Sequence, residues 1–224
     1  MQHTAAPRPD PSAPDLHDTL LSPSARAAFF DRVDREGFVV LRGVRSEHVS
    51  YRPVRGRSSP GKLSPGEFFH HDGCAGPTKP RVVEIRFPFQ DVPRNVATAV
   101  APFPALLAAM VRALPRALRH RPELHALDAD ELARAPRDEA DHVQGLLNRL
   151  VRRELPAADA RSYFREVERL SGAYVHRWAP GDSLFIANNN PVCTYQHRRS
   201  YPEVAFDGRP NGNLVKRWPA EELV

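Results

Sequence analysis

The sequence has few cysteines, very few lysines and no long hydrophobic run. Its two cysteines, Cys74 and Cys193, form no Cys-x-x-Cys pair, and a disulfide scaffold is excluded. No stretch approaches the ~18 uninterrupted apolar residues that a membrane-spanning helix needs. The first fourteen residues have neither a basic start nor an apolar stretch, so no signal peptide is expected. We therefore predict a cytoplasmic protein without a membrane partner.

The positive charge of the chain comes almost entirely from arginine, because lysine is scarce. Only three lysines stand among the 32 basic residues, and the formal net charge is +5. The arginines alternate with acidic residues, as in 137–139 and 165–169. No block of like charge forms the stripe that follows a phosphate backbone. The sequence therefore predicts no nucleic-acid partner, while an anionic small-molecule substrate is compatible with it.

The chain has enough apolar material for one domain, with 224 residues of which 41% are hydrophobic. Residues 1–18, rich in proline and aspartate, predict a flexible N-terminal tail. Apolar spacing predicts a helix over 25–35, strands over 38–41, 81–87 and 95–100, helices over about 105–170, and strands over 173–178, 183–187 and 193–197. Strands on both sides of a helical block indicate an α+β domain over residues 19–224, whose sheet closes around a helical insertion.

Four of the ten histidines lie in or beside strand-like segments: His70, His71, His176 and His197. Side chains alternate along an extended segment, so His70 and Asp72 point to one side and His71 to the other. A second histidine from another strand would complete a set of two imidazoles and one carboxylate with open positions, which suits Fe(II) that binds a co-substrate together with O2. A solvated surface cluster is the alternative interpretation of the His-x-Asp pattern.

The C-terminal third contains a longer pattern. The run from Trp178 to Asn189, with its Pro-Gly-Asp turn, is followed by Tyr195–Arg199. Together they resemble the strand–turn–strand signature of iron(II)/2-oxoglutarate-dependent oxygenases, in the taurine dioxygenase and clavaminate synthase-like branch. The runs 37–43 and 206–208 are similar to further parts of that branch. The resemblance implies a double-stranded β-helix (jelly-roll) core with flanking helices and the helical insertion.

Carried over position by position, the resemblance implies that His70, Asp72 and His197 bind Fe(II). The open positions of the metal would then take 2-oxoglutarate and O2. Thr98 stands where the family has a threonine that contacts the far carboxylate of 2-oxoglutarate. Two arginines compete for the family's arginine at that carboxylate, Arg209 and Arg217, and the sequence does not choose between them. Three further residues are candidate contacts of the metal ligands or of the substrate: His71, Asn189 and Arg199.

The activity that this resemblance implies is oxidation of a C–H bond. Hydroxylation of a small molecule, such as an amino acid or a natural-product intermediate, is the default outcome, with release of succinate and CO2. Desaturation, cyclisation and epimerisation use the same ligands and stay open. Two alternatives remain from other classes: a metal-dependent barrel enzyme without 2-oxoglutarate, such as a cupin-type dioxygenase or a hydrolase, and a non-catalytic barrel that binds a ligand. The chain is short for the family, so a homodimer that covers the site is a further possibility.

Overall fold

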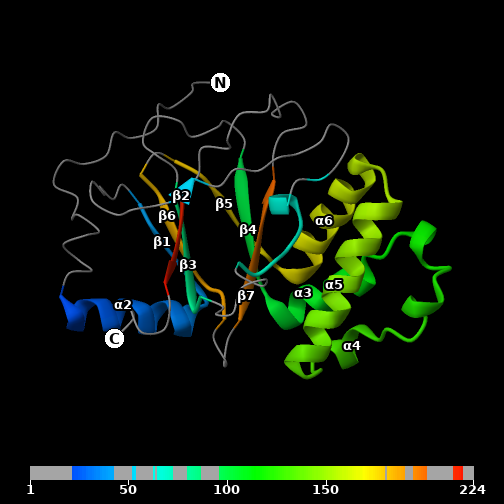
Figure 1. Ribbon diagram of the computed structural model, residues 1–224, viewed down its shortest axis with the longest axis horizontal. Helices are drawn as coiled ribbons and strands as arrows, with labels where there is room; N and C mark the ends of the chain where they lie inside the picture. The colour runs from blue at the N-terminus through cyan, green and yellow to red at the C-terminus, as the bar shows by residue number, and fades with distance from the viewer. Residues whose placement is uncertain are drawn as a thin grey trace.

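The computed structural model describes residues 22–42, 52–53, 63, 65–72, 80–86, 96–179, 181–189, 194–200 and 214–218. The predicted tail over residues 1–18 lies outside this part of the chain, and so do Arg209 and both cysteines. The described residues form two antiparallel sheets and a layer of helices (Figure 1). None of the helices in the described ranges is long and apolar enough to cross a membrane.

The larger sheet has five strands in the order β1-β6-β3-β8-β2. Their bounds are β1 Phe38–Leu41, β2 Arg52–Pro53, β3 Val82–Arg86, β6 Ser183–Ala187 and β8 Leu214–Trp218. Every neighbouring pair is antiparallel. Helix α2 (Pro23–Glu36) covers one face of this sheet, where Phe30 and Val33 pack against Phe185. The helix ends at Gly37, whose φ of 84° suits glycine because it has no Cβ.

The smaller sheet has three strands in the order β5-β4-β7. Their bounds are β4 Ala97–Pro102, β5 Tyr174–Arg177 and β7 Tyr195–Ser200. A one-residue bridge between His70 and His197 adds a further short segment beside β7. Along the chain, β1, β2, β3, β6 and β8 belong to the larger sheet, and the His70 segment, β4, β5 and β7 belong to the smaller one. Successive segments therefore change sheet except from β1 to β2 and from β4 to β5.

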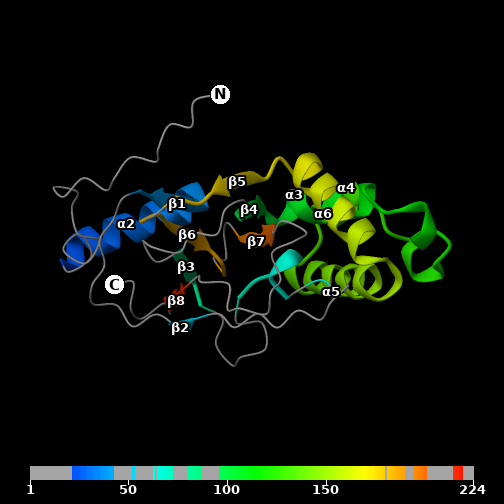
Figure 2. The same cartoon turned by 90° about the horizontal axis from the view of Figure 1, so that it is seen from above.

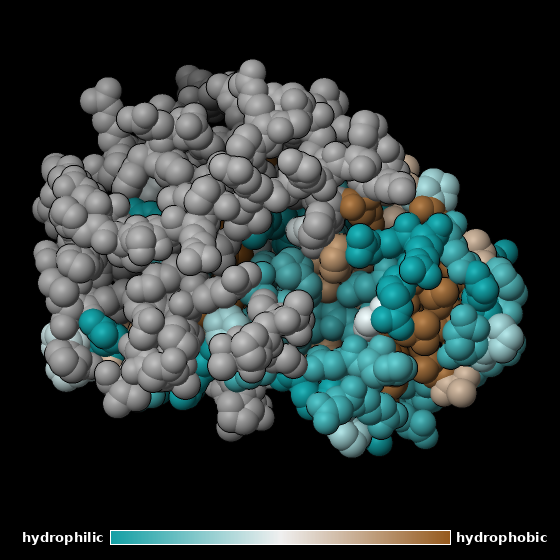
Figure 3. Space-filling view, in the orientation of Figure 1, coloured by the Kyte–Doolittle hydropathy of each residue, from teal (hydrophilic) through white to brown (hydrophobic). Residues whose placement is uncertain are grey.

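A helical layer covers the face of the smaller sheet that points away from the larger one. It contains α3 (Phe103–Arg112), α4 (Ala129–Leu132), α5 (Arg137–Glu154) and α6 (Ala157–Ser171), with 3-10 turns at 116–118 and 122–124; another 3-10 turn, Pro65–Glu67, precedes His70. Seen from above, α2 and this layer lie at opposite ends of the molecule with the strands between them (Figure 2). In space-filling view the layer presents mainly hydrophilic residues around a hydrophobic patch (Figure 3), as expected for amphipathic helices.

The helices of this layer begin in two ways: α3, α5 and α6 follow a proline and have no side-chain cap, whereas α4 has one. Asp128 caps α4, because its carboxylate accepts the backbone N–H groups of Asp130 and Glu131. Helix α6 begins directly after Pro156, and Asp159 lies in its first turn, where a negative charge is favourable near the helix N-terminus.

The smaller sheet has two different faces, which set the surroundings of the site. On β4, Ala99 and Ala101 belong to the core shared with the helices. Val100 belongs to a separate cluster between the two sheets, together with Val83 and Ile186 of the larger sheet. Because side chains alternate along a strand, every second residue of β4, β5 and β7 points between the sheets and the others point toward the helices.

Candidate metal centre

Three potential metal ligands converge between the two sheets. The ligand atoms of His70, Asp72 and His197 all lie within 4.8 Å of one another. Oδ1 of Asp72 is 3.6 Å from Nε2 of His70, and its Oδ2 is 4.0 Å from Nε2 of His197. The structure therefore brings together the three residues that the sequence analysis singled out, from segments more than a hundred residues apart in the chain.

Backbone pairing explains why the two histidines meet. His70 N–H donates to the carbonyl of His197 over 3.1 Å, and His197 N–H donates to the carbonyl of His70 over 3.3 Å. Directly paired residues of antiparallel strands place their side chains on the same face. The two imidazole rings consequently lie 4.5 Å apart between centroids, and Asp72 follows on the same side at a spacing of two residues.

The polar atoms that face this centre suit a bound cation. His70 Nδ1 lies 2.8 Å from the carbonyl oxygen of Phe68 and donates to it, which leaves Nε2 on the side of Asp72. Within the described part of the chain, Asp72 Oδ2 and both ring nitrogens of His197 are buried without a hydrogen-bond partner. Buried polar atoms in native proteins are normally satisfied. A divalent transition metal would satisfy Asp72 Oδ2 and Nε2 of His197, because two imidazoles and a carboxylate form a set that such ions prefer.

The ionisation states also fit metal binding. Burial alone would raise the pKa of the Asp72 carboxyl, but the contact with His70 and the nearby positive charges outweigh burial, and the pKa lies well below its usual range. Burial lowers the pKa of His197 to about 3, and the charges of His70 and Arg199 act in the same direction. At neutral pH the site therefore offers an ionised carboxylate and a neutral buried imidazole, the forms that bind metals.

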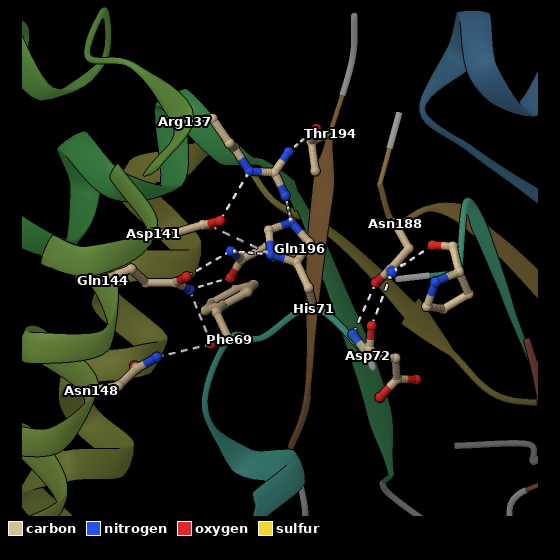
Figure 4. A network of polar contacts seen from close by, with 11 residues as sticks. Phe69, His71, Asp72, Arg137, Asp141, Gln144, Asn148, Asn188, Thr194 and Gln196 are labelled. Carbon is tan, nitrogen blue, oxygen red and sulfur yellow. Dashed lines mark hydrogen bonds and ion pairs between the residues drawn. The ribbon is translucent and has the colours of Figure 1, made fainter. Parts of the chain in front are cut away.

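Asn188 fixes the backbone of Asp72 from the end of β6. The N–H of Asp72 donates to Asn188 Oδ1 over 2.9 Å, and Asn188 Nδ2 donates to the carbonyl oxygens of Asp72 and Pro80 over 3.1 and 2.9 Å (Figure 4). The sequence analysis named Asn189, which in the structure donates its backbone N–H to the carbonyl of Arg81. The asparagine that touches a candidate ligand is its neighbour, which is the asparagine that follows Phe-Ile-Ala in the sequence pattern.

His71 lies on the opposite side of its segment, as alternation predicts. It is buried against the ring of Phe103, and its Nδ1 accepts from Gln196 Nε2 over 2.9 Å. Nη2 of Arg137 lies 3.4 Å from its Nε2. The structure thus places His71 with the helical layer and outside the group formed by His70, Asp72 and His197 (Figure 4).

A buried polar row crosses the smaller sheet beside the candidate ligands. Thr98 is paired with His176 on β5 and with Arg199 on β7, and all three side chains are buried. Thr98 Oγ1 accepts the indole N–H of Trp178 over 2.9 Å. His176 Nε2 lies 3.1 Å from Asp182 Oδ2. The row therefore combines the predicted residues Thr98 and Arg199 with a buried histidine–carboxylate pair to which the sequence analysis gave no role.

The second arginine candidate for the co-substrate can be placed by strand register. Arg217 lies on β8 opposite Val83 of β3, and Val83 is paired in turn with Ile186 of β6. Val83 and Ile186 pack in the cluster between the two sheets. Arg217 is therefore in register with Val83 and Ile186, two residues that face the space between the sheets. Thr98 faces the same space, because it alternates with Ala99 on β4.

Comparisons with known proteins give matches among solved structures alone. No protein-family model matches the chain, and no curated protein matches it either. The chain is similar to AAD-2 in complex with Mn(II) and N-oxalylglycine, at 14% identity and a TM-score of 0.44, covering 92% of this chain and 91% of that one.

Two further solved structures are similar in the same way. An asparagine oxygenase matches at 15% identity and a TM-score of 0.40, covering 88% of this chain and 77% of the other. A taurine dioxygenase from Burkholderia xenovorans matches at 13% identity and a TM-score of 0.40, covering 87% and 79%. Because all three TM-scores lie below 0.5, the proposals below rest on the geometry of the described residues and on the sequence motifs.

Proposed function

We propose that the protein is a non-haem Fe(II)-dependent oxygenase that uses 2-oxoglutarate as co-substrate, with His70, Asp72 and His197 as the metal ligands. The observation that carries this proposal is the convergence of two imidazoles and one carboxylate, at which Asp72 Oδ2 and Nε2 of His197 are buried without a hydrogen-bond partner in the described residues. When bound, Fe(II), 2-oxoglutarate and O2 supply the oxidation of a C–H bond with release of succinate and CO2. The alternation of Asp72 with His70 and the pairing of His70 with His197 support the same ligand set.

We further propose that the two sheets form a double-stranded β-helix, or jelly roll. The alternation of successive segments between the larger and the smaller sheet supports this topology. Jelly rolls are built from two facing antiparallel sheets connected in this manner. In that architecture the space between the sheets is the interior of the barrel, and the candidate ligands lie on its inner wall.

Thr98 and Arg217 are the proposed anchors for the far carboxylate of 2-oxoglutarate. Thr98 accepts a hydrogen bond from Trp178, so its own hydroxyl hydrogen can donate to a carboxylate. An arginine suits the second position because its planar guanidinium can donate two parallel hydrogen bonds to a carboxylate. The pairing of Arg217 with Val83 supports this arginine, and Arg209 stays the alternative.

Asn188 and Arg199, which lie beside the proposed ligands, suit a site that binds a small anionic molecule. Asn188 holds the backbone of Asp72, so the carboxylate keeps its direction toward the two imidazoles. The side chains of His70 and Asp72 are 21% and 15% exposed, which leaves one side of the site open to a small molecule. Arg199 adds a buried positive charge on the same side of β7 as His197, and it favours an anionic group in the substrate or co-substrate. A small-molecule substrate with a reactive C–H bond is the proposed class.

Anaerobic titration with Fe(II) and then 2-oxoglutarate tests the proposal. We expect a weak visible charge-transfer band that requires both additions and that disappears in His70→Ala. Arg217→Ala is expected to weaken 2-oxoglutarate binding while it retains the metal, and loss of the band in Arg209→Ala instead would assign the anchor to Arg209. Metal binding without the band would favour a barrel enzyme that does not use 2-oxoglutarate, and failure to bind any metal would favour a non-catalytic barrel.

The expected cytoplasmic location, the homodimer and the absence of a nucleic-acid partner stay predictions from the sequence.

A further inference from the structure

A second polar cluster lies on the other side of the strand segment that carries His70. Helix α5 contributes Gln144 and Asn148, which are four residues apart and therefore share one face of the helix. Gln144 Nε2 and Asn148 Nδ2 both donate to the backbone carbonyl of Phe69, each over 3.1 Å. The residue directly before His70 is thus held by two side-chain amides of one helix (Figure 4).

A third amide extends this contact to the strand of His197. Gln196 of β7 and Gln144 form a reciprocal pair, in which Gln196 Nε2 donates to Gln144 Oε1 over 2.7 Å and Gln144 Nε2 donates to Gln196 Oε1. Gln196 Nε2 also donates to His71 Nδ1 over 2.9 Å. Both glutamine NH2 groups therefore donate to two acceptors each, and both side chains are buried. We call Gln144, Asn148 and Gln196 the amide clamp.

The amide clamp holds the neighbours of both histidine ligands. Phe69 and His71 flank His70, and Gln196 directly precedes His197. The bridge between the two ligand segments itself has only the two backbone hydrogen bonds between His70 and His197. The strand β7 is also held by its pairing with β4 over the whole of Tyr195–Ser200, whereas the segment of His70 has this short bridge. The buried amide hydrogen bonds to Phe69 therefore add restraint where the backbone pairing is least.

We propose that the amide clamp of α5 and β7 is a positioning device, which holds His70 and His197 at the separation that metal binding needs. This inference rests on the proposed function, because it assigns a purpose to the spacing of the two ligands. It gives the helical insertion a role at the metal centre even though the clamp residues do not themselves touch the metal ligands' side chains. Residues that orient metal ligands typically change metal affinity by about 10- to 100-fold when they are replaced.

The test compares Gln144→Met with Tyr163→Phe. Gln144→Met keeps the length of the side chain and removes its amide. Tyr163→Phe is the matched control, because it removes a buried hydrogen bond, from Tyr163 Oη to the carbonyl of Met110 (2.9 Å), elsewhere in the same helical layer. Asn148→Leu is a milder second variant, which removes one of the two donors to Phe69 and keeps the pair of glutamines intact.

Two readouts are measured on the purified full-length protein. The first is the affinity for Co(II) alone, from its visible absorption; the second is amide hydrogen exchange at His70 and His197 in metal-free protein. We expect Gln144→Met to weaken Co(II) binding by about 10- to 100-fold and to speed exchange at both amides by about tenfold. Asn148→Leu should show smaller changes in the same direction, and Tyr163→Phe should leave both readouts within about twofold of the wild type while lowering its thermal unfolding temperature.

Unchanged Co(II) affinity in Gln144→Met would overturn the proposal, and so would equally fast exchange in Tyr163→Phe, because the amides would then act only as general structural contacts. A different result would show that the proposed function itself is wrong. In that case the wild type would not bind Co(II) in a manner that depends on His70, while the exchange data would still report whether the clamp holds the two segments.

Discussion

The two sides of the segment around His70 differ in how their polar atoms are satisfied. On the helix side, Gln144 and Gln196 donate every amide hydrogen, and His71 accepts one of them. On the side between the sheets, His197 is buried with both ring nitrogens unpartnered among the described residues. Buried polar atoms without hydrogen-bond partners are typical of functional sites. Buried polar groups with all their hydrogen bonds typically help to fix one folded arrangement. The comparison therefore separates a candidate metal-binding face from a supporting face.

Adjacent substitutions on β7 give the largest expected contrast between the two faces. His197→Leu should abolish metal binding, with an affinity loss of more than about 100-fold. In metal-free protein its free energy of unfolding should equal that of the wild type or exceed it by up to about 2 kcal/mol, because an apolar side chain replaces buried polar atoms that have no partner. Titration with Co(II) and urea unfolding in a chelator measure the two effects.

Gln196→Leu is the matched control for that experiment. It leaves the amide of Gln144 and Nδ1 of His71 without their partners, so it should lower the free energy of unfolding by about 2–4 kcal/mol. The distinction between the two faces would be lost if His197→Leu destabilised the metal-free protein as strongly as Gln196→Leu does.

A smaller effect is expected from pH. The pKa of His197 is about 3 in the folded protein and about 6.5 in an unfolded chain, so between these values the unfolded state binds more protons. The stability of metal-free protein should consequently fall by about 1.4 kcal/mol for each pH unit below 6.5 from this group alone. Asp72 acts in the same direction at lower pH, since its folded pKa is also lowered.

Urea unfolding of wild type and His197→Leu between pH 7 and pH 4.5 measures this contribution. The variant should show the shallower dependence on pH. Parallel curves for the two proteins would mean that His197 is not held neutral by burial.

Much of the fold could be predicted from residue spacing, and so could the local geometry of the candidate site. The strands over 38–41 and 183–187 have the expected bounds, because their apolar runs end at clear turn signals. Alternation along an extended segment placed His70 and Asp72 on one side and His71 on the other. These features depend on neighbours in the sequence, which a single sequence contains.

Features that depend on tertiary register could not be predicted in the same way. The expected strand over 193–197 is β7, Tyr195–Ser200, because the basic residues after His197 are buried by charged partners far away in the chain. Arg198, for example, pairs with Glu168 of α6 over 2.6 Å. The contact of Asn188 with Asp72 joins residues 116 positions apart, and the place of Arg217 opposite Val83 depends on the pairing of β8 with β3. The contacts of α5 with Phe69 likewise gave no signal in the sequence.

The most direct measurement is a crystal structure of the protein grown with Mn(II), with anomalous data that locate the ion. The account predicts one strong peak bound by His70 Nε2, Asp72 and His197 Nε2, with the amides of Gln144 and Asn148 still on the carbonyl of Phe69. A protein that holds no ion among these three side chains at saturating Mn(II), or that binds it at other residues, would contradict the central claim.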